Sequence, residues 1–221
     1  IFNSILKGDR ASKVRAIIVY PMNALVNSQY STLTEYKKNY EADTGMEFPI
    51  RFERYTGQEK EQLRNTLKNN PPHILLTNYV MLELMLVRPD EKIFVDASTS
   101  HIEYLVFDEL HTYRGRQGAD VALLVRRLSS RSGKKDLKCI GTSATMVSGK
   151  NTTSLDRRKA VSQFASSMFG IQIDADDVIE ETLKRLTISD GIPSDSALTT
   201  SFSEPVPSEI TTIIKHPLVS W

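Results

Sequence analysis

Two adjacent carboxylates, Asp108 and Glu109, directly follow a short apolar run at residues 104–107. A run of this length without polar residues is typical of a parallel strand that is covered on both faces. In open α/β sheets ligands bind beyond the carboxyl ends of such strands, so we expect both carboxylates to project into a ligand crevice. An Asp that holds magnesium, beside a carboxylate that polarises a water, is the acidic half of a site that hydrolyses nucleoside triphosphates. Alone, an Asp-Glu pair is common and usually belongs to a solvated turn.

Several other polar motifs follow predicted strands in the same way. In chain order, the full set is Tyr20-Pro21-Met22-Asn23-Ala24-Leu25, Tyr55-Thr56-Gly57, Thr77-Asn78, Asp108-Glu109-Leu110-His111 and Ser143-Ala144-Thr145. Because each motif follows a strand, a parallel sheet would bring all of them to one edge.

The elements that must position these motifs alternate between strand and helix. Apolar, β-branched runs predict strands at residues 14–20, 49–55, 73–76, 102–107 and 137–141. The clearest helical pattern is an apolar stripe with two arginines facing away from it: Val121, Leu124, Val125 and Leu128, with Arg126 and Arg127 opposite. This alternation predicts an α/β fold, a parallel sheet with helices on both faces.

Composition excludes several other classes of protein. The 221 residues are enough for one α/β domain and an appendage, and 28 Lys+Arg against 27 Asp+Glu leave no net charge that indicates a partner. The single cysteine, Cys139, excludes an internal disulfide framework and predicts core packing in a reducing cytoplasm. No apolar run approaches the ~20 residues of a membrane helix, so no membrane partner is predicted. No histidine has partners at metal-ligand spacing.

After residue 150 the character of the sequence changes. Apolar residues between 161 and 168 predict an amphipathic helix with Gly170 as its C-cap. Asp174 is predicted to cap a further helix that contains Ile179. Residues 187–208 are rich in Ser, Thr, Pro and Asp, which predicts a linker or a surface excursion.

The order of the five motifs resembles the first RecA-like domain of superfamily 2 helicases, the DEAD/DEAH-box group, from motif Ia through motif III. The likeness covers residues 1–150 and implies a RecA-like P-loop NTPase domain there. Residues 151–221 would then be a helical extension and a linker towards a second RecA-like domain. The strings Tyr20–Leu25 and His111–Gly115 resemble a narrower group, the MrfA/Hrq/Lhr-like branch of large DNA helicases, which also has members in phage-defence systems.

The resemblance implies roles in ATP hydrolysis for the residues near the acidic pair. Asp108 would hold Mg²⁺ through its water shell, and Glu109 would position the attacking water as the base. His111 would link the nucleotide site to the facing domain. The string Ser143-Ala144-Thr145 would couple hydrolysis to movement of the two domains.

The resemblance also implies that the remaining motifs contact one strand of nucleic acid, through Pro21, Asn23, Ala24, Thr56, Gly57, Thr77 and Asn78. Contacts to the sugar-phosphate backbone position a strand without reading its sequence, as a translocating motor requires. Gly57 would allow close approach to a phosphate, and Thr77 at a helix start would offer a hydroxyl and free N–H groups. Asn23 and Thr77 are equally compatible with ordinary helix caps.

Two expected parts of such a motor do not occur in this sequence. No G-x-x-x-x-G-K-[ST] phosphate-binding loop is present, so the chain resembles a fragment that begins just after that loop. The second RecA-like domain, with its arginine finger, is also absent. Since such a finger contributes about 10³–10⁵ in rate in related enzymes, the chain alone is expected to hydrolyse ATP poorly or not at all.

Three functions agree with these residues. The first is an ATP-dependent helicase that closes two RecA-like domains on one strand; the branch favours DNA, although backbone contacts barely distinguish DNA from RNA. The second is a translocase or remodeller that moves on double-stranded DNA without unwinding it. The third is an inactive RecA-like module that only binds, against which the intact acidic pair, His111 and Ser143-Ala144-Thr145 argue.

Overall fold

The computed structural model describes residues 1–8, 13–89, 101–133, 137–144, 153–180, 193–203, 207 and 209–220. Contacts divide the chain into two compact units, Ile1–Val178 and Ile179–Trp221. No helix in these ranges combines the length and the apolarity that crossing a bilayer requires.

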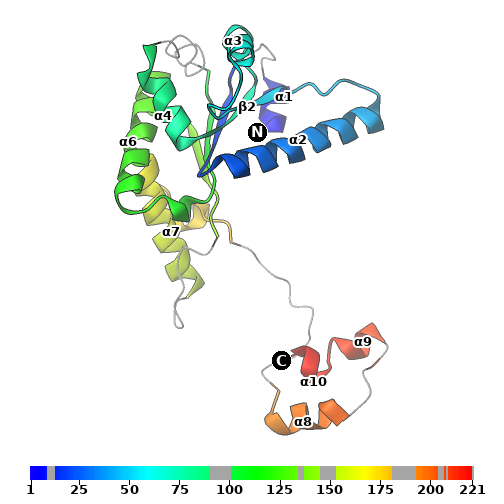
Figure 1. The fold of residues 1–221 in the computed structure, drawn as a ribbon. Helices are drawn as coiled ribbons and strands as arrows, with labels where there is room; N and C mark the ends of the chain where they lie inside the picture. Colours follow the sequence, from blue (N-terminus) through cyan, green and yellow to red (C-terminus); the bar gives the residue numbers. More distant parts are fainter. Residues whose placement is uncertain are drawn as a thin grey trace. The chain divides into compact units, whose positions relative to one another are not determined.

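The first unit is built on a five-stranded parallel sheet with the order β2-β3-β1-β4-β5 (Figure 1). The strands are β1 (Ala16–Tyr20), β2 (Phe52–Tyr55), β3 (Ile74–Asn78), β4 (Tyr104–Phe107) and β5 (Lys138–Gly141). Each lies in one of the apolar runs or overlaps it, so the predicted parallel sheet is confirmed. The central strand β1 is largely buried, because it is paired on both sides and core clusters cover both of its faces.

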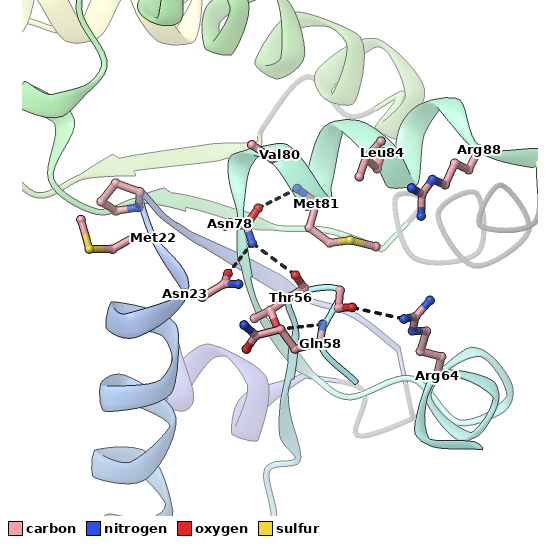
Figure 2. A pocket seen from close by; sticks show the side chains of 12 residues that line it. Met22, Asn23, Thr56, Gln58, Arg64, Asn78, Val80, Met81, Leu84 and Arg88 are labelled. Atoms are coloured by element: carbon pink, nitrogen blue, oxygen red, sulfur yellow. Dashed lines mark hydrogen bonds between the residues drawn. The ribbon is translucent and has the colours of Figure 1, made fainter. Parts of the chain in front are cut away.

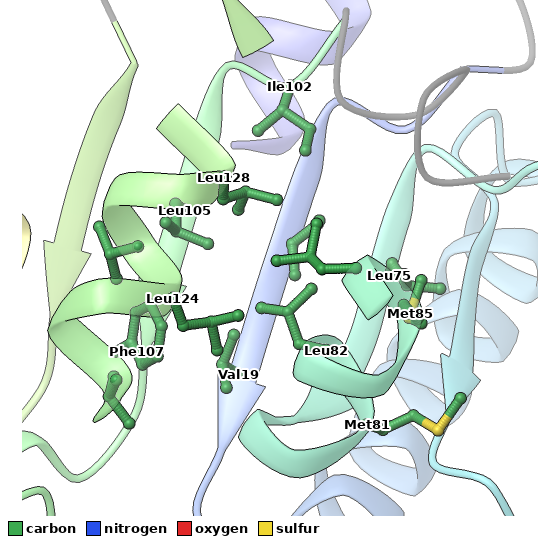
Figure 3. Close-up of a cluster of buried hydrophobic side chains, with 14 of the residues drawn as sticks. Val19, Leu75, Met81, Leu82, Met85, Ile102, Leu105, Phe107, Leu124 and Leu128 are labelled. Carbon is green, nitrogen blue, oxygen red and sulfur yellow. The ribbon is translucent and has the colours of Figure 1, made fainter. Parts of the chain in front are cut away.

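Alternate side chains of a strand point to opposite faces of the sheet. Both faces carry apolar side chains, and helices cover both of them. Ile17 and Val19 of β1 belong to a core cluster with residues of α4, α6 and α7, which Figure 3 shows in part. Ala16 and Tyr20 belong to a second cluster with residues of α1 and α2. The helices of this unit are α1 (Phe2–Lys7), α2 (Asn23–Thr44), α3 (Glu61–Asn69), α4 (Tyr79–Val87), α6 (Gly115–Ser132) and α7 (Ser154–Phe169). The predicted α/β class, with helices on both faces, is confirmed.

The single cysteine and the α6 stripe lie where their patterns predict. The four apolar residues of the stripe are at most 2% exposed, whereas Arg126 and Arg127 are exposed. Cys139 is half-buried in β5 and packs against the first core cluster. Burial raises the pKa of its thiol to about 11, so the thiol stays protonated at neutral pH.

The chain beyond β5 extends the first unit past residue 150. Helix α7 packs against α6 and ends at Gly170 in a left-handed conformation (φ 70°), as the sequence predicts for a C-cap. At its start, Thr153 and Asp156 form a reciprocal capping box, and the hydrogen bonds from Thr153 lower the pKa of Asp156 below its usual value. The division of the chain at residue 150 stays a prediction.

One expectation for the second half of the chain is wrong. Asp174 caps only one 3-10 turn, η2 (Ala175–Asp177), because Asp177 closes the cap by accepting from the Asp174 N–H (2.9 Å) and the chain is extended at Val178. Ile179 is therefore outside any helix and 96% exposed. The rest of that predicted helix lies outside the described residues.

In the segment at residues 187–208, predicted to be a linker or a surface excursion, the structure has the helix α8 (Asp195–Ser203). Three of its hydroxyl side chains donate to carbonyls one turn earlier, including Thr199 to Asp195 (2.8 Å) and Ser201 to Ala197 (2.8 Å). These bonds satisfy the hydroxyl groups within the helix, so a Ser/Thr-rich composition does not prevent it. The short helices α9 (Ile210–Ile213) and α10 (Pro217–Ser220) follow.

Candidate functional site

The sheet register brings the predicted motifs to one edge of the first unit. Tyr55 pairs with Thr77, and Phe107 pairs with Gly141, so these strands end at similar levels. All strands are parallel, and each motif begins within two residues of the last residue of its strand. Thr145 lies outside the described residues, and the other motif residues are described.

The acidic pair leaves the sheet at the end of β4. The Asp108 N–H still donates to Val19 of β1 (2.9 Å), whereas Glu109 adopts a left-handed conformation (φ 55°, ψ 51°). A non-glycine residue in this region costs of order 1–3 kcal/mol and persists only where its surroundings hold it. A 3-10 turn, η1 (Leu110–Thr112), begins at the next residue. Both carboxylate residues are half-exposed at this edge.

Thr142, the residue after β5, holds the acidic pair in this conformation. Its hydroxyl donates to Oδ1 of Asp108 and accepts from the Glu109 N–H (3.3 Å). Its backbone N–H donates to the Phe107 carbonyl (3.0 Å), and its carbonyl accepts from the Leu110 N–H (2.8 Å). The sequence analysis missed Thr142, although it directly precedes Ser143 at a strand end. Four hydrogen bonds from one residue therefore fix the turn that carries both carboxylates.

His111 lies between the acidic pair and the next motif. Its Nδ1 is 3.2 Å from the Ser143 hydroxyl oxygen, with which it forms a hydrogen bond, and 3.2 Å from Oε2 of Glu109. The second contact is within ion-pair distance only, and no described residue donates a hydrogen bond to Oε2, which is buried. The structure thus brings Glu109, His111 and Ser143 together; Ala144 follows, exposed.

Two buried tyrosines lie close enough to Asp108 for its negative charge to affect the pKa of their hydroxyl groups. The pKa values of Tyr20 and Tyr113 are both raised. Burial is the main cause, and the negative charge of Asp108 is the second. Both phenols are therefore neutral near neutral pH. Asp108 accordingly lies at the boundary between the apolar core and the exposed edge.

The acidic pair fits magnesium in the manner typical of nucleotide sites. Within the described ranges, no three or more His, Cys, Asp or Glu side chains group so that they could enclose a metal ion. Mg²⁺, however, usually keeps several waters and is held by one or two carboxylates plus substrate phosphates. Asp108, half-exposed at the end of β4, is suited to that role.

The other motifs line an open pocket of about 500 Å³ at the ends of β1, β2 and β3 (Figure 2). Its lining residues are Pro21, Met22, Asn23, Thr56, Gly57, Gln58, Arg64, Asn78, Val80, Met81, Leu84 and Arg88. Five of the seven residues predicted to contact nucleic acid are among them, and Ala24 and Thr77 are not.

Asn78 joins three motifs at this pocket. Its side-chain oxygen accepts from the Met81 N–H (2.7 Å) and so caps α4. Its side-chain nitrogen donates to the side-chain oxygen of Asn23 (2.6 Å) and to the carbonyl of Thr56 (3.5 Å). Asn23 is not itself a cap, because α2 begins after Met22 without a side-chain cap.

Thr77 has a different place from the one expected. Its side chain is fully buried, and its hydroxyl donates to the Tyr55 carbonyl (2.6 Å) of the neighbouring strand. The expectation that this hydroxyl is offered to a phosphate is therefore wrong for this structure, because Thr77 is still inside β3 and α4 begins two residues later. Thr77 instead ties the ends of β2 and β3 together.

Glu59 is a second residue that the sequence analysis missed. Its side chain is 7% exposed and accepts from the N–H groups of Thr56 (2.8 Å) and Gly57 (2.9 Å) and from the Thr56 hydroxyl (2.7 Å). Gly57 has a φ of 87°, which favours glycine. The Thr56–Gly57 turn is thus shaped by a buried carboxylate three residues away.

Comparisons with known proteins agree with this geometry. The DEAD/DEAH box helicase family model matches residues 1–153. The Druantia protein DruE of Escherichia coli (strain UMEA 4076-1) is 42% identical over 94 residues, which are 38% of this chain and 5% of DruE. The ATP-dependent helicase Lhr-Core of Methanothermobacter thermautotrophicus is 30% identical over 143 residues, 63% of this chain and 16% of Lhr-Core. A crystal structure of the helicase MrfA bound to DNA matches 76% of this chain and 20% of MrfA, with a TM-score of 0.59 and 27% identity.

This chain therefore spans between 5% and 16% of these two curated relatives. The likeness to MrfA-like and Lhr-like helicases that the motifs predict is confirmed by both the sequence and the structural match. The family model spans the whole sheet and all five motifs at its carboxyl edge, and this chain belongs to the DEAD/DEAH box helicase family.

Proposed function

We propose that this chain is the part of an ATP-dependent DNA helicase or translocase that carries the acidic half of the ATP site and a contact surface for one strand. The observation that carries the proposal is the shared edge of the sheet. The acidic pair with Thr142 lies at the ends of β4 and β5, and the polar pocket lies at the ends of β1, β2 and β3. One sheet thus carries both the proposed nucleotide site and the proposed contact surface for a strand of nucleic acid.

In the ATP site, Asp108 would hold Mg²⁺ through water, and the ion would neutralise charge on the phosphates. Glu109, half-exposed at the same edge, would accept the proton of the attacking water through its carboxylate. His111, in contact with Ser143 and near Glu109, would transmit the state of this site towards the second RecA-like domain. The string Ser143-Ala144-Thr145 would share this coupling role.

DNA is the proposed track because of one relative. MrfA, which has 27% identity to this chain, is bound to DNA in its crystal structure, and the match with it includes most of this chain. The pocket itself offers amide and guanidinium groups, which bind a sugar-phosphate backbone without reading its bases. We therefore propose that contact in the pocket is independent of sequence.

The proposal is tested by measuring ATP hydrolysis by the full-length protein that contains this chain. Steady-state phosphate release is compared without nucleic acid and with single-stranded DNA, double-stranded DNA or RNA of equal length. Stimulation by DNA above that by RNA is expected. Absence of hydrolysis in every condition would instead indicate a module that only binds, and a strand-displacement assay separates unwinding from translocation on duplex DNA.

Thr142→Val is expected to lower kcat of the stimulated reaction by roughly 10–100-fold, because a hydrogen bond to a charged group contributes about 1.5–3 kcal/mol. The substitution keeps the shape of the side chain but removes the donor to Asp108 and the acceptor of the Glu109 N–H. The matched control is Thr66→Val, which removes an exposed hydroxyl that bonds only to its own helix. Equal kcat for both variants would show that Thr142 does not position the acidic pair.

A further inference from the structure

The pocket at the ends of β1, β2 and β3 has a cationic end that the five motifs do not explain. Two arginines, Arg64 and Arg88, line it, and none of its described lining residues is Asp or Glu. Figure 2 shows both arginines at the opposite end of the pocket from Met22 and Asn23. The charge at this end is therefore complementary to an anion.

The backbone of the Thr56–Gly57 turn is already occupied by an anion of the protein itself. Both N–H groups of the turn donate to one oxygen of Glu59, and the Thr56 hydroxyl donates to the other. Because the Glu59 side chain is 7% exposed, water and ligands have little access to these bonds. A phosphate in the pocket consequently cannot be held by these amides unless the turn reorganises.

Arg64 is positioned by the same turn. Its Nε donates to the Glu59 carbonyl (3.0 Å), and its Nη2 donates to the Gly57 carbonyl (3.2 Å), the second of which Figure 2 draws. A guanidinium group carries five N–H donors, so these two bonds leave donors for a ligand. A guanidinium that two carbonyls already hold in place also loses less rotamer entropy when it binds.

The helix α4 supplies the rest of this end of the pocket. Val80 and Leu84 are one turn apart on one face of the helix, and Arg88 is the residue that directly follows the helix. The Val80 side chain is 48% exposed, and Leu84 is half-buried beside it. An exposed apolar wall next to two cations suits a strand whose sugars and bases are not paired, since single strands bind through charge together with apolar or stacking contacts.

We propose that Arg64 and Arg88 bind a backbone phosphate of single-stranded nucleic acid, with the adjoining sugar or base against Val80 and Leu84. In this arrangement Glu59 is a positioning residue, because it shapes the turn that holds Arg64. The inference rests on the proposed function and names the contact by which the pocket holds a strand. It differs from the expected mode, in which the amides of Thr56 and Gly57 bind the phosphate.

The test is the salt dependence of single-stranded DNA binding by the full-length protein. Fluorescence anisotropy of a labelled oligothymidine is measured over a range of salt concentrations for the wild type and for Arg64→Gln, Arg88→Gln and Arg127→Gln. Arg127 is the control, because it lies on α6 in an exposed ion pair with Glu83. Arg64→Gln and Arg88→Gln are each expected to weaken binding roughly tenfold or more. Because the two arginines share one phosphate, each substitution is expected to reduce the slope of log Kobs against log salt by up to about 0.7.

Two results would overturn the inference in different ways. If the wild type binds and both pocket variants keep its affinity and its salt slope, the arginines do not contact a phosphate, and the proposed function stands. If the wild type binds no oligonucleotide, the proposed function fails as well. Arg88 is exposed, so Arg88→Gln tests the inference even if Arg64→Gln disturbs the turn. Circular dichroism of each variant monitors folding.

Discussion

Glu109→Gln in the full-length protein is expected to lower kcat of ATP hydrolysis by roughly 10²–10⁴-fold, the usual contribution of a general base. The amide has nearly the shape of the carboxylate but accepts no proton from a water. The loss falls on the chemical step, so the KM for ATP is expected to change little.

The local structure makes this substitution a clean one. Glu109 is held in a left-handed conformation by bonds to its backbone and to those of its neighbours, including the Glu109 N–H bond to Thr142. These bonds do not use the side chain, so Gln is expected to keep the same turn. The buried Oε2 of Glu109 receives no hydrogen bond from the residues that the structure describes, so no such bond is lost.

The measurement is steady-state phosphate release at saturating single-stranded DNA. Glu83→Gln is the matched control, because Glu83 lies on α4 in an exposed ion pair with Arg127. This control is expected to retain wild-type kcat, since exposed pairs of this kind contribute little. Turnover of the Glu109→Gln variant near that of the control would assign activation of the water to another group.

The sheet and its helices could be predicted because their patterns are local. The run at residues 104–107 is apolar because β4 packs against a core cluster on each face of the sheet, and the α6 stripe repeats at helical spacing because one face is buried. The position of the acidic pair followed, since a strand end in a parallel sheet is also a sheet edge. The prediction of a helix after Asp174 was wrong because a cap sequence does not determine how far a helix continues.

The hydrogen bonds inside the site could not be predicted from the sequence. Thr142 reaches Asp108 only because β4 and β5 are neighbours in the sheet, although 34 residues separate them in the chain. Glu59 accepts hydrogen bonds from the amides of its own turn, and this contact depends on the backbone angles at Gly57, which a glycine permits but does not determine. Thr77 was predicted to stand at the start of a helix, but α4 begins two residues later. Errors of this size are usual at the boundaries of elements.

Phe107→Ala is expected to lower the free energy of unfolding of the first unit by about 3–5 kcal/mol, the usual cost of removing a buried aromatic side chain. Phe107 is fully buried at the end of β4. Its ring contacts the rings of Tyr113 (5.8 Å between centroids) and Phe169 (6.1 Å), which come from the turn after the acidic pair and from α7. Since whole domains are stable by only about 5–15 kcal/mol, this is a large share.

Urea unfolding of the 221-residue chain, followed by far-ultraviolet circular dichroism, measures this loss. Leu123→Ala is the control, because Leu123 lies on α6 with 56% of its surface exposed and its loss is expected to cost no more than about 0.5 kcal/mol. A change below 1 kcal/mol for Phe107→Ala, on the same order as the control, would show that the core relaxes around the cavity. In the full-length protein, the cavity left by Phe107 adjoins Asp108, which is the next residue in the chain. We therefore expect kcat to fall by more than the fraction of unfolded protein explains.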